Sequence, residues 1–212
     1  RQMLGKEQEA WLQNALQTSK ARGAAWQVLG QQVLMGKLNI PVIPPEELAK
    51  LELSEYARPR VAQSQQLAPY GLPSNLDAWD GYPAARERLF AMFSAHATNP
   101  ISLAGDTHNG WAFNLTNQKG EAVGVEWGTP GVSSPGLENY VPVPPEPMQA
   151  LLKGASPELV ACDTSQRGWT HVTLTPEAAT AQWRFVSSVT EPTYQVSAGE
   201  PLVSQRNTRK LD

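Results

Sequence analysis

The 212-residue chain has one cysteine, three histidines and no long apolar run. The single cysteine, Cys162, excludes a disulfide within the chain and leaves the redox compartment unreadable. No stretch approaches the roughly 18 apolar residues of a membrane-spanning helix. A three-histidine zinc site would need His96, His108 and His171 to converge. His96 follows a helical pattern and His171 lies in an alternating strand pattern, so we expect neither of them to be a metal ligand.

Charge is also scarce, since Lys, Arg, Asp and Glu make up 17% of the chain and the formal net charge is -3, with a pI near 5.7. The sequence therefore lacks the basic excess that nucleic-acid binding requires. It also lacks an initiator methionine and a signal peptide. Because it begins with Arg1, we expect it to start inside a longer protein, as a processed product or a fragment.

Apolar periodicity predicts an intermixed series of helices and strands. Helices are expected at 6–19, 45–53, 82–95 and 148–152, and strands at 26–35, 101–104, 111–116, 122–127, 169–175 and 180–189. This order indicates an α/β sandwich. Residues 38–79 are the least periodic part and are interpreted as an ordered insertion with a lid role. Residues 159–205 are predicted to form C-terminal antiparallel strands.

The most informative stretch is the apolar run 99–104, which ends in Gly105-Asp106-Thr107-His108. Gly105 is expected to supply the positive φ angle of the turn. A carboxylate and an imidazole separated by one residue can bind two metal ions side by side, because carboxylate oxygen suits a hard ion and imidazole a borderline one. The alternative is that Asp106 only caps a turn.

Five phrases in the same order and rough spacing resemble the alkaline phosphatase D-like (PhoD-like) metallophosphoesterase family. They are Arg1–Leu12, Trp26–Leu29, Trp79–Arg86, Gly105–Ala112 and Glu126–Ser134. The resemblance extends to about Ala181 and corresponds to the C-terminal half of the family's catalytic domain. It implies part of a four-layer αββα sandwich with a mixed sheet. This chain would supply roughly one sheet and its helices, with an apolar sheet face exposed for the missing half.

The resemblance also implies a dinuclear metal centre that hydrolyses phosphate monoesters or diesters. His108 would ligate the first ion, Fe(III), and Asp106 the second, Ca(II) or another divalent ion. The remaining ligands would lie upstream of Arg1, in the missing N-terminal half of the same catalytic domain, so we expect the chain alone to be weak or inactive. The family further implies a periplasmic or secreted location.

Three further residues are candidates for substrate binding. Asn109 could orient His108 or bind a phosphate oxygen, or it could be a polar loop residue. Asp80 is interpreted first as the N-cap of the following helix, and Arg86 as a structural ion-pair partner, with phosphate binding as the alternative for each. The alternative for the whole chain is a non-catalytic folded fragment or interaction domain derived from such an enzyme.

Overall fold

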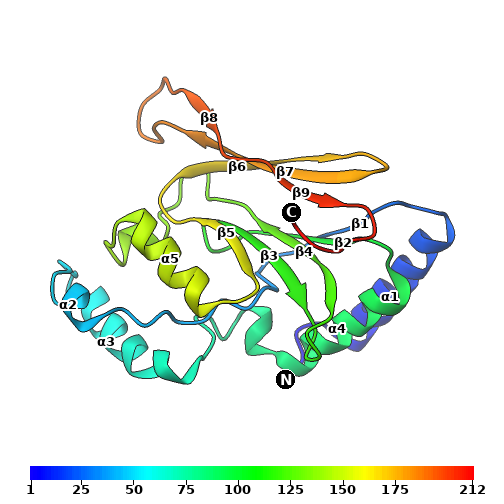
Figure 1. The fold of residues 1–212 in the computed structure, drawn as a ribbon, viewed down its shortest axis with the longest axis horizontal. Coiled ribbons are helices and arrows are strands. Elements are labelled where there is room, and N and C mark those ends of the chain that lie inside the picture. Colours follow the sequence, from blue (N-terminus) through cyan, green and yellow to red (C-terminus); the bar gives the residue numbers. More distant parts are fainter.

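A computed structural model describes all 212 residues and consists of three layers. A five-stranded sheet lies in the middle, helices cover one of its faces, and a four-stranded antiparallel sheet covers the other (Figure 1). The structure is thus mixed α/β, as the sequence predicts. No helix is both long enough and apolar enough to cross a membrane.

The central sheet is mixed, with the strand order β1-β2-β4-β3-β5. Its strands are β1 (Gln27–Gly30), β2 (Pro100–Ala104), β3 (Gly110–Thr116), β4 (Ala122–Gly128) and β5 (Leu159–Asp163). β1, β2 and β4 are parallel, whereas β3 runs antiparallel to both of its neighbours. The carboxyl ends of β1, β2 and β4 therefore meet at one edge of the sheet. The turn between β3 and β4 has Gly120 at φ 78°, which confirms the predicted hairpin.

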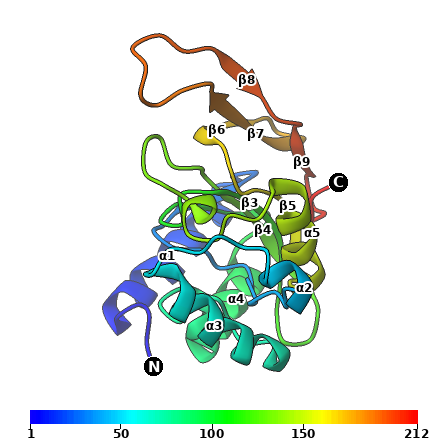
Figure 2. The same ribbon diagram turned by 90° about the vertical axis from the view of Figure 1, so that its left-hand side faces the viewer.

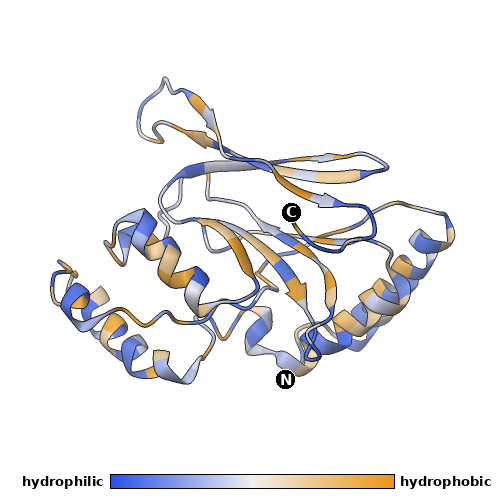
Figure 3. Ribbon diagram, viewed as in Figure 1, coloured by the Kyte–Doolittle hydropathy of each residue, from blue (hydrophilic) through white to orange (hydrophobic).

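Alternation along the strands sends apolar side chains to both faces of this sheet. On β3, Trp111, Phe113 and Leu115 belong to the core beneath the helices, and Ala112 belongs to the core between the two sheets. Hydrophobic residues are concentrated in these central strands (Figure 3). The sheet is therefore buried on both sides, as expected for a sheet with parallel strands.

The helix layer consists of α1 (Lys6–Ala21), α4 (Pro83–His96) and α5 (Pro145–Ala155). Leu12 and Leu16 of α1 are buried in the same core as Phe90 and Phe93 of α4. α5 contributes Met148 and Leu152 at a four-residue spacing, which places both on one helical face. All three helices overlap predicted ones, although α5 is longer at both ends.

The second sheet corrects the expectation of an exposed apolar face. It contains β6 (Arg167–Leu174), β7 (Ala178–Val186), β8 (Val196–Ala198) and β9 (Leu202–Gln205). Every second residue of β7 is buried, ending in Trp183 and Phe185, and these pack in one core with Ile101 and Trp127 of the central sheet. The chain thus covers this face of its own sheet. β5, predicted among the C-terminal antiparallel strands, instead belongs to the central sheet.

Two other predictions differ from the structure. The run 26–35 forms a strand only up to Gly30, and the rest is a loop. The insertion 38–79 contains a short α2 (Pro45–Leu48), an unpredicted α3 (Ala57–Leu67) and the 3-10 turns η1 (Ala68–Tyr70) and η2 (Trp79–Gly81). α2 and α3 lie together on the side that faces the viewer in Figure 2.

Candidate functional site

Three loops converge at the edge where the parallel strands end. The loop that follows β2 lies between the other two, because Gly105 donates its backbone N–H to Gln32 O at 3.1 Å and Thr129 donates to Ala104 O at 2.9 Å. The parallel register of β1, β2 and β4 brings the ends of these strands together. Asp106 and His108 therefore leave the sheet at the edge that usually holds the binding sites of open α/β sheets.

The backbone of this loop is strained at the two predicted ligands. Asp106 has a φ of 72° and His108 a φ of 61°, whereas Gly105 is not in the left-handed region. The expectation that Gly105 provides the positive φ is therefore wrong. Non-glycine residues in this region cost of order 1 kcal/mol or more each and cluster at functional sites. Two such residues in one loop point to a function for the loop itself.

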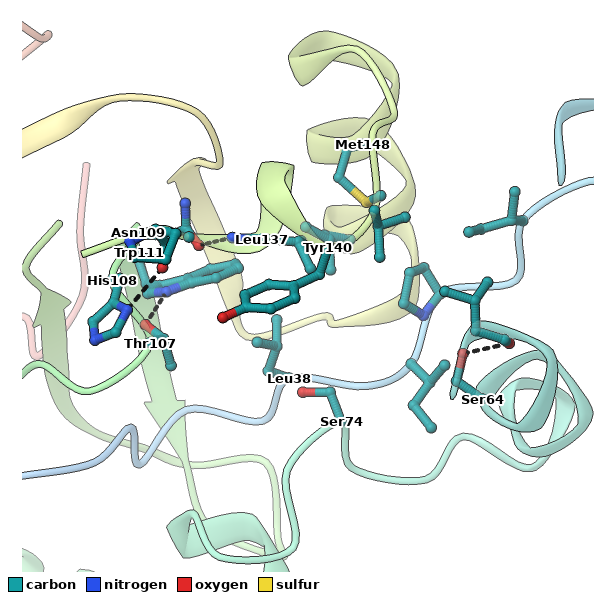
Figure 4. Close-up of a pocket in the computed structure, with 18 of the residues that line it drawn as sticks. Leu38, Ser64, Ser74, Thr107, His108, Asn109, Trp111, Leu137, Tyr140 and Met148 are labelled. Carbon is teal, nitrogen blue, oxygen red and sulfur yellow. Dashed lines mark hydrogen bonds between the residues drawn. The ribbon is translucent and has the colours of Figure 1, made fainter. Parts of the chain in front are cut away.

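The His108 ring has a defined hydrogen-bonding state. Its Nδ1 lies 2.8 Å from the carbonyl oxygen of Pro135 (Figure 4). Because a carbonyl oxygen only accepts, Nδ1 carries the proton, which leaves the lone pair of the neutral ring on Nε2. This arrangement is the usual one for a metal-binding histidine, whose second nitrogen donates to a carbonyl or carboxylate.

Residues distant in sequence hold the loop in place. Trp111 Nε1 donates to Thr107 Oγ1 at 2.6 Å, and Gly131 donates its backbone N–H to the His108 carbonyl at 2.9 Å. Arg167 donates to the same His108 carbonyl and forms an ion pair with Glu138. Neither Arg167 nor Glu138 was predicted, because nothing in the local pattern indicates contacts across 59 and 29 residues.

The surroundings of Glu138 favour the charged form of its carboxyl group. Partial burial opposes its ionisation, but hydrogen bonds from Arg167 and from backbone N–H groups outweigh burial and lower the pKa of the carboxyl below its ordinary value. The lowered pKa favours the charged form of Glu138, which pairs with Arg167 beside the His108 loop.

The donor set fits a metal ion only in part. The Asp106 carboxylate is exposed and the His108 ring is half-buried, and both line one cavity. A carboxylate oxygen and an imidazole nitrogen with a free lone pair are suitable ligands for a divalent or trivalent ion. However, the chain contains no group of three or more His, Cys, Asp or Glu side chains placed to hold a metal. These two residues could therefore supply some, but not all, of the ligands that an ion requires.

The shared cavity has a volume of about 480 Å³. Four of its polar residues, Asp106, Thr107, His108 and Asn109, come from the loop after β2, and three more, Ser64, Gln65 and Ser74, come from the insertion 38–79. Figure 4 labels Thr107, His108 and Asn109 of the first group and Ser64 and Ser74 of the second. Its other walls come from the insertion 38–79, the loop 135–141 and α5, and they are mainly apolar. The insertion thus forms one wall of the cavity that contains the two predicted ligands.

Asn109 is buried and holds the neighbouring loop. Its Oδ1 accepts the Leu137 backbone N–H at 2.9 Å, and its Nδ2 lies 3.5 Å from Glu138 Oε2. The side chain is 1% exposed. The structure therefore favours a positioning role for Asn109, of the kind expected for a polar loop residue.

Asp80 does not cap the helix that follows it. The N-cap position of α4 is Tyr82, and no side chain caps that helix. Instead, Asp80 Oδ2 accepts the backbone N–H of Leu38 at 3.1 Å. Burial raises the pKa of Asp80 to about 6, although this hydrogen bond and the charge of Arg86 act in the opposite direction. The prediction of an N-cap is wrong because Asp80 lies within the η2 turn and α4 begins three residues later, at Pro83.

Arg86 is buried on the same face of α4 as Leu89, Phe90 and Phe93, which follow it at helical spacing. Its Nη2 lies 2.6 Å from Glu158 Oε2, its Nε donates to Met35 O at 2.7 Å, and its Nη1 donates to Thr116 O at 3.2 Å. All three guanidinium nitrogens are thus engaged inside the protein, and the side chain does not line the cavity. The structure favours the ion-pair interpretation over phosphate binding.

Polar side chains hold the backbone of residues 35–39 in place, which the sequence did not indicate. They include Arg86, Asp80 and two glutamates. Five consecutive backbone N–H groups, from residue 35 to residue 39, each donate to a side-chain oxygen. The acceptors are Glu126 for Met35 and Gly36, Glu158 for Lys37, Asp80 for Leu38 and Ser156 for Asn39, at 2.8–3.1 Å. We call residues 35–39 the tethered segment. It leads directly into the cavity wall.

Glu126, like Ser156, is fully buried. It also accepts hydrogen bonds from Ser102 and Gln31. Complete burial raises the pKa of Glu126 to about 7, against the effect of the hydrogen bonds from Gly36, Met35 and Ser102. Part of the population therefore carries a proton on this side chain near neutral pH.

Comparison with known proteins identifies the family to which the chain belongs. Residues 1–183 match the family described as PhoD-like phosphatase. The chain is 30% identical over 216 aligned residues to alkaline phosphatase D of Bacillus subtilis (strain 168), covering all of this chain and 31% of that protein. A solved structure titled "Structure of PhoD" superposes with a TM-score of 0.68 at 26% identity, covering 100% of this chain and 35% of the other.

The chain belongs to the PhoD-like phosphatase family, which confirms the resemblance predicted from the five phrases. It spans about a third of the length of the relatives that it matches. The match to alkaline phosphatase D lies in the C-terminal part of that protein, as predicted.

Proposed function

We propose that this chain is the C-terminal part of the catalytic domain of a metal-dependent phosphoesterase, and that Asp106 and His108 are two of its metal ligands. One observation is central to this proposal. A carboxylate and an imidazole on one strained loop open into the same cavity at the carboxyl edge of the sheet. Membership in the PhoD-like phosphatase family supports the reaction class.

In the proposed site His108 binds through Nε2 and Asp106 through its carboxylate. Bound metal ions would supply a water of lowered pKa and neutralise the oxygen that leaves. The chain's own residues have supporting roles: the Pro135 carbonyl orients the imidazole, and Arg167 holds the His108 carbonyl. On the family resemblance we assign Fe(III) to His108, and Ca(II) or another divalent ion to Asp106.

The remaining ligands are proposed to come from the upstream half of the same domain. That half would also complete the four-layer αββα sandwich, of which this chain has one helix layer and two sheets. Residues 38–79 are proposed to act as the insertion that closes the site. We propose a periplasmic or secreted location for the parent protein, which recovery of that protein from the exported fraction would test.

The proposal is tested by Asp106→Ala and His108→Ala in the full-length parent. Each change should lower kcat/KM for p-nitrophenyl phosphate by about 100-fold or more, because loss of a ligand weakens both metal binding and charge neutralisation. Metal analysis should show loss of the trivalent ion in the His108 variant and of the divalent ion in the Asp106 variant. His171→Ala is the control, since His171 is exposed on β6.

The 212-residue chain assayed alone should turn over far below the ordinary enzymatic range of about 1–1,000 per second. Near-normal rates and unchanged metal content in the two variants would contradict the assignment. The alternative, a non-catalytic folded fragment or interaction domain, would then stand, and the family would describe ancestry and fold without activity.

A further inference from the structure

The cavity beside Asp106 and His108 is far larger than a phosphate group requires. Its volume of about 480 Å³ falls within the range of roughly 300–1,000 Å³ that is typical of cavities for drug-sized ligands. Since Asp106 and His108 come from one short loop, most of this volume lies beyond the proposed metal ligands. The remaining space could therefore hold another part of the substrate.

The lining of that space is mainly apolar and carries no charged side chain, although Ser64, Gln65 and Ser74 of the insertion add neutral polar groups. One wall contains Leu38, Ile40, Ile43 and Val61 from the insertion, and the opposite wall contains Leu137, Tyr140, Val141, Met148 and Leu152 (Figure 4). No lysine or arginine lines the cavity. A second phosphate or a carboxylate on the substrate would thus find no cation there, whereas an apolar group would leave water for an apolar surface.

The insertion wall is held in a defined position by hydrogen bonds. Ile43 donates its backbone N–H to Gln65 Oε1 at 2.8 Å, and Gln65 Nε2 donates to Pro41 O at 3.1 Å. Ser74 donates to Leu38 O at 2.8 Å. Together with the tethered segment, these bonds form the wall before a ligand arrives, so binding need not order it.

We propose that this cavity is a subsite for an apolar alkyl or aryl group carried by the phosphate ester. The inference rests on the proposed function, since it places the phosphate at Asp106 and His108. The substrate is then amphipathic: its anionic end meets the metal ligands, and its apolar group lies between α3 and the 137–141 loop. Ile40 and Tyr140 are specificity-determining residues, one on each wall.

The test measures binding of phosphonates, which mimic the ester but cannot be hydrolysed at the P–C bond, to the full-length parent by calorimetry. Methyl-, hexyl- and phenylphosphonate differ only in the apolar group. Because each buried methylene strengthens binding by up to about fourfold, hexylphosphonate should bind at least about 10-fold more tightly than methylphosphonate. The phenyl arm distinguishes a preference for a ring from a preference for a chain.

Ile40→Ser and Tyr140→Ala should reduce this difference in affinity to about threefold or less, while methylphosphonate binding stays within about twofold. Tyr140 is 48% exposed, so its truncation preserves the fold. Val42→Ser is the matched control, because Val42 neighbours the same wall but is 54% exposed and does not line the cavity.

Equal affinities for methyl- and hexylphosphonate would overturn the proposal, as would an unchanged preference in both wall variants. The two proposals fail in different ways. An inactive parent that still prefers the hexyl group counts against phosphoester hydrolysis alone, whereas an active parent without that preference counts against the subsite alone.

Discussion

Arg86 and Arg88 lie two residues apart on α4, and each pairs with a glutamate. The Arg86–Glu158 pair is almost fully buried, with side-chain exposures of 2% and 6%. The Arg88–Glu9 pair has exposures of 43% and 22%. Burial determines how much the loss of one partner lowers the free energy of unfolding. Water screens an exposed pair and solvates the charge that remains, whereas a buried charge that loses its partner stays unpaired and unsolvated.

Arg86→Ala should lower the free energy of unfolding by about 3–5 kcal/mol, because it leaves Glu158 buried without its partner. It also removes the donors to Met35 O and Thr116 O. Denaturant unfolding measures the effect. Arg88→Ala is the control and should cost no more than about 1 kcal/mol. Similar small losses in both variants would contradict the structural role of Arg86.

Among the elements, the tethered segment explains why the end of the apolar run 26–35 is not a strand, although β1 itself already ends at Gly30. The apolar run 26–35 predicts a longer strand, but the N–H groups of Met35 and Gly36 are bonded to Glu126 and are unavailable to a neighbouring strand. Leu34 and Met35 are apolar because they are buried under the helices. A buried loop and a buried strand have the same apolar composition, so the pattern alone does not separate them.

Gly36→Ala tests the fit of this segment against the sheet. An added Cβ would lie 2.2 Å from Phe113 Cγ, in a ring that is fully buried. Either the ring or the segment must move, so we expect a loss of about 1–3 kcal/mol in the free energy of unfolding. Gly30→Ala is the control, because a Cβ at Gly30 meets nothing within 4 Å. Equal thermal stability of the two variants would argue against this close contact.

At the scale of the whole molecule, the buried acids make stability depend on pH. The folded-state pKa is about 7 for Glu126 and about 6 for Asp80, both above the ordinary values. The folded protein therefore retains protons that the unfolded chain has already released. Stability contributed in this way is fully present below the unfolded pKa values and is lost as the pH rises toward 7.

We expect the free energy of unfolding to fall between about pH 4.5 and pH 7, with a slope of at most about 1.4 kcal/mol per pH unit for each proton. Glu126→Gln should flatten the slope between pH 5 and pH 7. It should also lower stability at pH 5, because the amide NH₂ group would face backbone donors. Exposed Glu177→Gln is the control. A slope unchanged by Glu126→Gln would show that other groups cause it.

The order of most helices and strands, the hairpin at Gly120 and the family were all predictable from the amino-acid sequence. These features depend on local periodicity, on turn residues and on short sequence phrases. Each of these signals is contained in a short stretch of the chain. The sequence also identified Asp106 and His108 as the candidate ligands, because a polar pair at the end of a buried strand is a local signal.

Which polar residues surround that loop, and which are buried in the interior, depends on contacts between distant parts of the folded chain. Arg86 is predicted to be an ion-pair partner, but its partner Glu158 lies 72 residues away and is not indicated by the sequence. Likewise, Glu126 meets Met35 across 91 residues, and Arg167 meets His108 across 59. Such partners leave no local periodicity, because chain folding rather than sequence spacing brings them together, and their hydrogen bonds offset the cost of their burial.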